Sequence, residues 1–353
     1  MDGRTWRFDV GTGCNMCAFK DITHGFLGQI LRTALAALAL LTPSAFRTPI
    51  FTSSALAQSS SSVRIIVPFP PGGSADILAR LLGQEIGQRA QQTMVVENRP
   101  GAGASIAYEY TARAAPDGNT IVVAANSVVI NPLVHSVNFD PVKSFAPVCN
   151  LVTSPLIFVV AAASPFKTIG DLIGAAQVKP GAITVAALGP ATTQHIAFES
   201  FERTTKTNMI FVPFAGGAPA ITALLGQQVD AALVNYSEGV EQIKSGKLRA
   251  LATASPLRLK PAPDLPTVAE SGYPGYAAEV WLGLLAPAGT PADKITQLGN
   301  WFTAAMKSPE VDAKLENVGL YPAVRCGGDF ARFIDAQTAY YARIIADAHI
   351  KVE

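Results

Sequence analysis

Charged side chains and cysteines are scarce in this chain of 353 residues. Asp, Glu, Lys and Arg make up 15% of it, and 27 basic residues nearly balance 26 acidic ones, for a formal net charge of +1. A chain so balanced lacks the basic surface with which proteins hold nucleic acid or an anionic membrane. Four cysteines are too few for the disulfide framework of a small secreted protein. We therefore expect no nucleic-acid partner.

The usual catalytic and cofactor motifs are missing as well. The sequence has no Gly-Lys-Ser/Thr phosphate loop and no Gly-x-Ser-x-Gly nucleophile turn. Gly101-Ala102-Gly103 resembles the start of a dinucleotide-binding loop, but Ile106 stands where that fingerprint has its third glycine. The four histidines are scattered, so no nucleophile–base set or metal-ligand set emerges. We expect no catalytic residues, no metal and no cofactor.

The chain is rich in apolar residues, at 49%, yet no run of them reaches the length of a membrane span. The longest run near the start, Leu31–Leu41, covers roughly 11 residues where a span needs ~20. It fits the core of a signal peptide, and Ala55-Leu56-Ala57 supplies the small residues of a cleavage site. We predict cleavage after Ala57 and export of a soluble mature protein.

Two details of this leader stay open at the level of sequence. The leader is long, so the true start is either Met1 or Met16. Cys14-x-x-Cys17 is either a redox or metal pair or part of a discarded leader, and we interpret it as leader.

Beyond residue 57, short β-branched runs alternate with stretches in which apolar residues recur at helical spacing. Turn signals such as Pro116-Asp117-Gly118 separate them, and Thr168–Asp171 has the pattern of a capping box. Such alternation predicts an α/β fold with mostly parallel sheets flanked by helices. The predicted strands are 63–67, 94–96, 120–124, 156–162, 183–187, 210–212 and 229–234, and the predicted helices include 77–86, 104–115 and 219–226.

One pattern occurs twice. Val67–Gly73 (VPFPPGG) precedes a helix that ends Leu-Leu-Gly, and Val212–Gly217 (VPFAGG) precedes another with the same ending. Glycines let the backbone turn sharply and approach a ligand, and the helix that follows directs its free amides and positive end into the turn. Each unit is a candidate anion site built from main chain. Because they lie far apart in the sequence, we expect one in each lobe, facing an anion with two negative ends.

Several residues admit a structural interpretation beside the functional one. A Gly-Gly turn before a helix is common in any α/β protein, and Ser74 and Asp76 could simply cap the first helix. His195 lies in a Thr-rich turn where it either contacts a ligand or supports the start of a helix. Cys149 and Cys326 could form a disulfide in an oxidising compartment, but nothing in their spacing demands it, and we favour two free or buried thiols.

The order of these motifs resembles one family, the substrate-binding proteins of tripartite tricarboxylate transporters, of the Bordetella-uptake-gene (Bug) type. The resemblance covers about Val63 to Ala346. It is carried by Val67–Asp76, Val96–Gly103, Ala112–Gly118, Asn131-Pro132, Val212–Phe214, Gly246–Ala252, Leu265–Glu270 and Ala286–Pro291.

This resemblance implies a two-lobed periplasmic binding protein of the type II Venus-flytrap kind. It implies that residues 58–160 and 280–353 form one lobe, that residues 161–279 form the other, and that the chain crosses between them at 156–162 and 280–285. The implied ligand is a small organic mono-, di- or tricarboxylate, which the protein, acting as a monomer, hands to membrane permease subunits.

The resemblance also assigns binding residues. The first lobe would contribute its glycine turn and two polar residues after the third strand, and the second lobe would contribute a Thr-rich turn, the second glycine turn and one strand end. Phe214 and Ala215 replace the Tyr and Lys usual in the family, which removes a hydroxyl and a cation. The predicted ligand-binding residues are Phe69, Gly72, Gly73, Ser74, Asp76, Ser127, Asn131, Thr192, Thr193, His195, Phe214, Gly216, Gly217, Ala218 and Asn235.

Two other classes remain as alternatives. A receptor of the same build could dock on a membrane kinase and report the ligand instead of delivering it. An enzyme on the same scaffold would need a titratable pair in the cleft, and the only candidate residues for such a pair are Asp76, His195 and Glu199.

Overall fold

The computed structural model describes residues 62–348. The predicted leader, the cleavage after Ala57, the alternative start at Met16 and the Cys14–Cys17 pair lie outside the described residues. None of the helices between residues 62 and 348 is long and apolar enough to cross a membrane.

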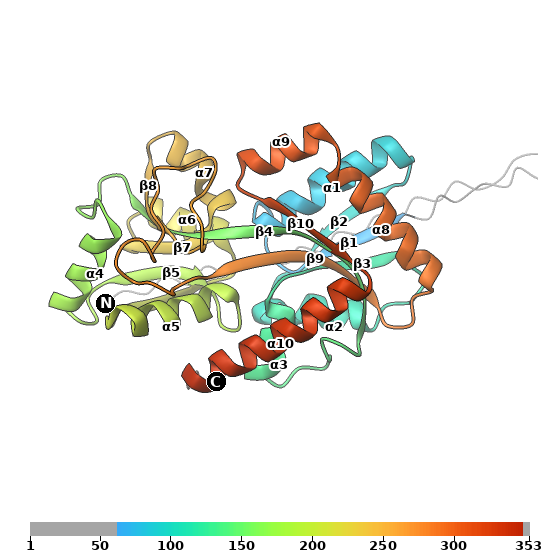
Figure 1. Ribbon diagram of the computed structural model, residues 1–353, viewed down its shortest axis with the longest axis horizontal. Coiled ribbons are helices and arrows are strands. Elements are labelled where there is room, and N and C mark those ends of the chain that lie inside the picture. Colours follow the sequence, from blue (N-terminus) through green and yellow to red (C-terminus); the bar gives the residue numbers. More distant parts are fainter. Residues whose placement is uncertain (1–61, 349–353) are drawn as a thin grey trace, which may run out of the picture. The chain divides into compact units, whose positions relative to one another are not determined.

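Strands and helices alternate along most of the described chain (Figure 1). The strands are β1 (Val63–Val67), β2 (Met94–Asn98), β3 (Thr120–Ala124), β4 (Phe145–Ala161), β5 (Thr184–Leu188), β6 (Ile210–Phe214), β7 (Ala231–Asn235), β8 (Leu248–Thr253), β9 (Glu279–Pro287) and β10 (Tyr321–Cys326). The helices are α1 (Ser74–Ala90), α2 (Ser105–Ala112, after the short 3₁₀ turn Ala102–Ala104), α3 (Ser127–Val134), α4 (Ile169–Val178), α5 (Thr193–Thr205), α6 (Gly217–Leu225), α7 (Tyr236–Lys244), α8 (Ala292–Met306), α9 (Pro309–Asn317) and α10 (Gly328–Ala348).

The strands join in the order β2-β1-β3-β9-β4-β7-β5-β6, and β8 and β10 pair with different stretches of β4. β1 lies parallel to β2 and β3, and β5 lies parallel to β6 and β7. Every pair that involves β4 or β9 is antiparallel. The predicted α/β class is confirmed, but the sheet is mixed instead of mostly parallel, because the two long strands run against their neighbours.

The 17-residue strand β4 belongs to both halves of the sheet. Residues 145–155 pair with β9, and residues 156–161 pair with β7 and β8. Helices α1, α8 and α9 cover one face of the first half while α2, α3 and α10 cover the other (Figure 1). The parallel strands on either side of β4 and β9 thus bring their carboxyl ends, where helices begin, toward one region.

Local sequence explains the elements that were easiest to predict. All residues of β3 are buried, as its continuous apolar run indicates for a central strand. α4 begins with the predicted capping box, in which Thr168 Oγ1 accepts the Asp171 amide at 3.1 Å and the Asp171 carboxylate accepts the Thr168 amide at 2.9 Å. Predicted helix 104–115 is shorter than expected, since α2 ends at Ala112.

Cys149 and Cys326 form a disulfide, so the expectation of two free thiols is wrong. The two residues stand opposite each other in the antiparallel pair of β4 and β10, with 4.0 Å between their Cα atoms. Only this long-range pairing brings residues 177 positions apart into bonding distance. A closed loop of that length restricts the unfolded chain strongly.

Candidate ligand-binding site

The two glycine turns line one cavity. The β1–α1 turn contributes Phe69, Gly73 and Ser74, and the β6–α6 turn contributes Gly216 to Ala218. The remaining space is about 20 Å³, close to what one water molecule occupies. Besides the turns, the lining residues are Pro70, Ala75, Ala125, Ser127, Leu188, Thr192, Thr193, Gln194, Asn235, Glu238, Val280 and Leu282.

Five helices begin at this cavity, each directly after a strand. The strand–helix pairs are β1–α1, β3–α3, β5–α5, β6–α6 and β7–α7, and each places at least one residue of its turn or first helical turn in the lining. The first amides of an α-helix have no carbonyl partner within the helix, and its N-terminus carries roughly half a positive charge. No Lys or Arg lies among the described lining residues, so the positive potential comes from backbone. Such a site favours an anion.

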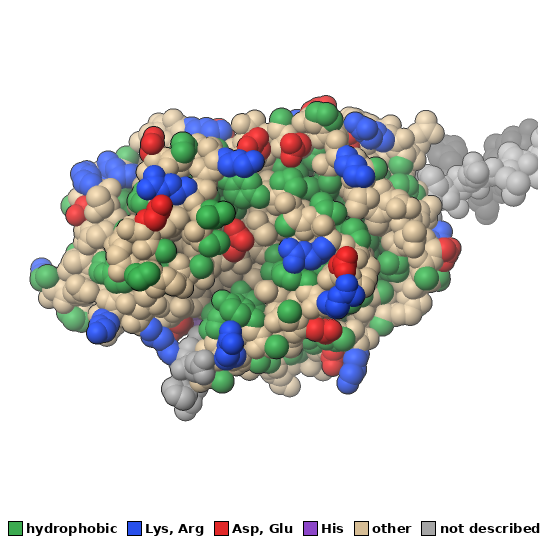
Figure 2. Space-filling model, viewed as in Figure 1, with side chains coloured by type: hydrophobic (Ala, Val, Ile, Leu, Met, Phe, Trp, Pro, Cys, Tyr) green, Lys and Arg blue, Asp and Glu red, His purple; other side chains and the backbone are tan. Residues whose placement is uncertain are grey.

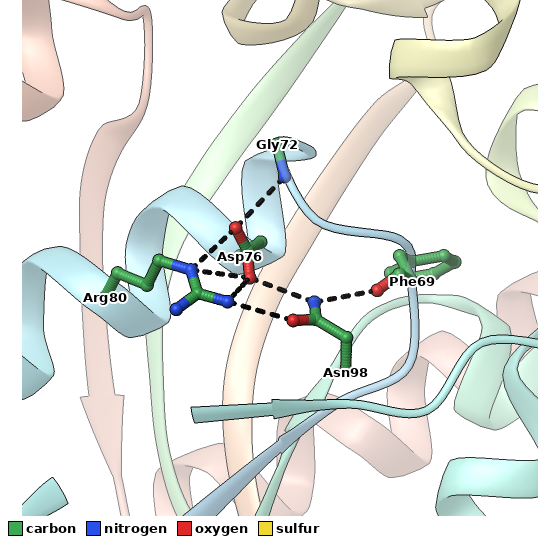
Figure 3. A network of polar contacts seen from close by, with 5 residues as sticks. All are labelled: Phe69, Gly72, Asp76, Arg80 and Asn98. Carbon is green, nitrogen blue, oxygen red and sulfur yellow. Dashed lines mark hydrogen bonds and ion pairs between the residues drawn. The ribbon is translucent and has the colours of Figure 1, made fainter. Parts of the chain in front are cut away.

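A network of side chains holds the β1–α1 turn (Figure 3). The buried Asp76 carboxylate accepts hydrogen bonds from the Gly72 amide at 3.0 Å, from Arg80 Nε at 2.9 Å and from Asn98 Nδ2 at 2.9 Å. Asn98 Nδ2 also donates to the carbonyl oxygen of Phe69 at 3.0 Å. Burial opposes the ionisation of Asp76, but these hydrogen bonds outweigh it and lower its pKa below the ordinary value. Asp76 is therefore an anion that fixes the turn.

The same turn shows why glycine is needed at its corner. Gly72 has φ +84°, a conformation that other residues rarely adopt. The N-cap of α1 is Gly73, which makes no side-chain hydrogen bond to the helix, so Ser74 is not the cap that the sequence allowed. No side-chain hydroxyl therefore caps the start of α1, and Gly73, Ser74 and Ala75 line the cavity.

The β6–α6 turn lies close against the first turn. A Cβ atom at Gly216 would lie 2.8 Å from Pro70 Cδ, so only a glycine lets the turns approach this closely. The Phe214 carbonyl oxygen accepts the amide of Gly189 at 2.9 Å, which ties this turn to the end of β5. Pro219 is the third residue of α6 and has no N–H, so the exposed amides at this helix start are those of Gly217 and Ala218.

Glu238 is the one titratable side chain among the described residues that line the cavity. It stands in the first turn of α7, where Oε2 accepts the Asn235 amide at 2.9 Å and Oε1 accepts Asn235 Nδ2 at 3.1 Å. It also accepts the Ser74 amide from α1. Burial raises the pKa of Glu238 to about 7, although these hydrogen bonds act to lower it.

Sequence reasoning missed Glu238. The signal was Asn235-x-x-Glu238 after a predicted strand, a capping-box pattern that occurs at many ordinary helix starts. The pattern predicts that the Glu side chain turns back toward the strand end. It does not indicate that the end of this strand lines a cavity.

Most of the predicted binding residues line the cavity, and the others do not. Those in the lining are Phe69, Gly73, Ser74, Ser127, Thr192, Thr193, Gly216, Gly217, Ala218 and Asn235. Those outside it are Gly72, Asp76, Asn131, His195 and Phe214. Gly72 and Asp76 hold the first turn, and the Phe214 carbonyl braces the second.

Asn131 and His195 are buried and occupied elsewhere. Asn131 Nδ2 donates to the carbonyl oxygens of Gly103 and Ser127, both at 2.8 Å, which joins α3 to the turn before α2. His195 packs its ring against Phe211, with centroids 4.8 Å apart. Burial, with a smaller contribution from His135, lowers the pKa of His195 to about 4, so the ring is neutral at physiological pH.

The face in Figure 2 carries basic and acidic side chains interspersed, without a large area of one sign. Among residues 62–348 no group of three or more His, Cys, Asp or Glu side chains is arranged to hold a metal ion.

Comparison with known proteins gives the family. The model of the tripartite tricarboxylate transporter family receptor matches residues 78–350. BugT of Bordetella pertussis is 31% identical over 294 residues, which are 82% of this chain and 90% of that protein.

Solved structures agree with the family match. The chain is similar to the periplasmic binding protein BugD, at 29% identity and a TM-score of 0.79 over 83% of this chain and 99% of that one. An R. palustris protein with adipate shares 29% identity and a TM-score of 0.79, covering 82% and 98% of the two chains. MatC from Rhodopseudomonas palustris, with bound malate, shares 28% identity and a TM-score of 0.75, covering 80% and 98%. The chain belongs to the tripartite tricarboxylate transporter family of receptors, whose relatives are periplasmic solute-binding proteins.

Proposed function

We propose that this protein captures a small organic carboxylate in the cavity between its two glycine turns and delivers it to the membrane permease of a tripartite tricarboxylate transporter. The observation that carries the proposal is the convergence of five helix N-termini on a cavity without Lys or Arg. Fixed backbone amides hold an anion without a flexible cation. The adipate and malate of the two R. palustris structures support the ligand class.

Export fits this role. We propose that the leader is removed near Ala57 and that the mature chain works in the periplasm, as its relatives do. We also propose the lobes 58–160 with 280–353, and 161–279, because β4 continues from one half of the sheet into the other and β9 pairs with β4 only up to that point.

The cavity as it stands is too small for a dicarboxylate, because about 20 Å³ holds one water molecule. Ligand entry therefore requires the turns to separate and close again, and a bend in β4 and β9 would do this. Charge-assisted hydrogen bonds contribute about 1.5–3 kcal/mol each. Four to six of them offset the cost of association and leave the roughly 8 kcal/mol of a micromolar complex.

The test is calorimetric titration of the mature protein with mono-, di- and tricarboxylates, adipate and malate included, and with an uncharged sugar and an amine. We expect at least one carboxylate to bind with micromolar affinity and the sugar and amine to give no heat. If only the sugar or the amine binds, the proposal is wrong.

A matched pair of variants locates the site. Ala218→Asp puts a carboxylate on the first turn of α6 at the cavity, and Ala292→Asp puts one on the first turn of α8, away from it. We expect the first variant to lose carboxylate binding by more than 100-fold, since the new anion takes the amides and repels the ligand, and the second to bind like the parent. Equal binding by both variants would show that the ligand sits elsewhere.

A further inference from the structure

Glu238 lies where the two glycine turns meet. It accepts the Ser74 amide at the start of α1, and a Cβ atom built at Gly73 would lie 3.3 Å from its Oε1. A Cβ atom at Gly217 would lie 1.9 Å from its Oε2, so the Glu238 carboxylate packs directly against the first residue of α6. The protein's own carboxylate therefore lies against the amides that the proposed ligand needs.

A ligand carboxylate held at the starts of α1 and α6 would lie next to Glu238 once the turns close again. Two carboxylates in one desolvated site repel each other, and the usual outcome is that one of them keeps a proton. A neutral carboxyl at position 238 changes from competitor to partner, because its O–H can donate a hydrogen bond to the ligand.

We propose that Glu238 couples ligand capture to the uptake of one proton, which makes it the residue that selects carboxylates by their ability to accept its hydrogen bond. This inference rests on the proposed function. The proton comes from solvent onto a Glu238 oxygen, no covalent bond to the ligand forms, and the Ser74 amide at the start of α1 passes from Glu238 to the ligand.

The surrounding groups leave Glu238 as the one that titrates. On the α1 side Asp76 is held ionised by Arg80 and Asn98, and on the α5 side the burial of His195 keeps the ring neutral. On α7 itself the nearest titratable groups are Tyr236 and Glu241, neither of which lines the cavity. The described residues of α3 and α6 include no titratable side chain, and Glu279 of β9 lies in a different pocket. Burial raises the pKa of Glu238 to about 7, although its hydrogen bonds act to lower it. At neutral pH, protonation of Glu238 therefore requires little free energy.

Titration calorimetry with adipate and malate as probes tests this at pH 6.5 and pH 8.5, in two buffers of different ionisation enthalpy. With a pKa of about 7, an affinity that requires protonated Glu238 falls roughly 25-fold between these pH values. The parent protein should take up about one proton per ligand at pH 8.5 and markedly less at pH 6.5. Glu238→Gln should bind equally at both pH values with no proton uptake at this site. Glu241→Gln, which changes an exposed side chain one turn along the same helix, should behave like the parent.

The outcomes separate the two proposals. If a probe binds the parent protein with no proton uptake and no dependence on pH, the coupling is wrong while carboxylate capture stands. If Glu238→Gln keeps the proton uptake, another group titrates and Glu238 is structural. If Glu238→Gln does not fold, the proton count of the parent protein alone decides. If no carboxylate of the panel binds at either pH, the proposed function fails and this inference fails with it.

Discussion

The β1–α1 and β6–α6 turns share a sequence motif, but different groups hold them. The first turn is held mainly from its own helix, since the Asp76 carboxylate accepts the Gly72 amide and also binds Asn98 on the next strand. The second turn has no such acid, because α6 has no acidic residue in its first turn. It is tied instead to the end of β5 by the Gly189 amide, which donates to the Phe214 carbonyl oxygen, and it lies close against Pro70 and Glu238 of other segments.

This difference separates what the motif specifies from what it does not. Val-Pro-Phe followed by Gly-Gly specifies a backbone turn that aims a helix N-terminus at the cavity in both places. In the first turn the supporting carboxylate belongs to the helix that follows, whereas the second turn is supported by residues of other segments. We therefore expect the first turn to keep its conformation with and without ligand, and the conformation of the second to depend on whether ligand is bound.

The largest expected effect comes from Gly217→Ala. The new Cβ would lie 1.9 Å from Glu238 Oε2 and 2.0 Å from its Cδ, so Glu238 must leave or α6 must retreat. We expect carboxylate affinity, measured by calorimetry, to fall by more than 100-fold, which corresponds to about 2.7 kcal/mol. Gly174→Ala in α4 is the control, because no other atom lies within 4 Å of a Cβ built at Gly174. It should bind normally and gain up to about 1 kcal/mol of stability. Normal binding by Gly217→Ala would show that the second turn is more adaptable than its contacts indicate.

An intermediate effect is expected from Asp76→Asn, which removes the local support of the first turn. The amide keeps the shape but faces Arg80 and Asn98 with its own N–H groups, so we expect a loss of about 1–3 kcal/mol in the free energy of unfolding. The exposed Asp335→Asn should stay within about 0.5 kcal/mol. Urea denaturation followed by circular dichroism measures both.

The pH dependence of that stability carries a definite sign. The pKa of Asp76 is lower in the folded state than in the unfolded chain, so its contribution is fully present above the unfolded pKa of about 3.9 and is lost as pH falls through the folded value. Asp76→Asn should therefore lose less stability than the parent between pH 5 and pH 3. Parallel losses in the two proteins would mean that Asp76 does not hold the turn as an anion.

Much of the fold could be predicted because its signals are local. β3 is bounded by the turn at Gly118, and its apolar run gave both ends correctly. Only the last part of β4 was predicted, because Pro147 and Pro155 are residues that usually interrupt a strand. In the structure the strand continues through both: Pro147 lies where the register against β9 shifts, and Pro155 lies where the pairing with β9 ends. The disulfide was missed because β10 meets β4 only through a pairing far along the chain.

The candidate site divides in the same way. The glycine turns were found because a sharp backbone turn needs a recognisable residue, as the positive φ of Gly72 shows. Asp76, Asn131 and His195 stand near the right strand ends, but sequence does not tell whether a polar side chain faces the cavity or satisfies its own backbone. Glu238 shows the converse, since a common capping pattern places a carboxylate in the cavity.

The smallest expected effect comes from Gly73→Ala, and it measures how differently the two turns meet Glu238. Gly73 has φ −80°, which any residue adopts, and its new Cβ would lie 3.3 Å from Glu238 Oε1. A shift of a few tenths of an ångström relieves that contact, so we expect carboxylate affinity to fall by about 2- to 5-fold, roughly 0.4–1 kcal/mol. Removing the shared neighbour with Glu238→Ala should then rescue Gly217→Ala strongly and Gly73→Ala hardly at all, because the contact with Glu238 is severe at position 217 and slight at position 73. Equal rescue of the two variants would mean that both turns depend on Glu238 to the same extent. The proposed difference in how the two turns are supported would then be wrong.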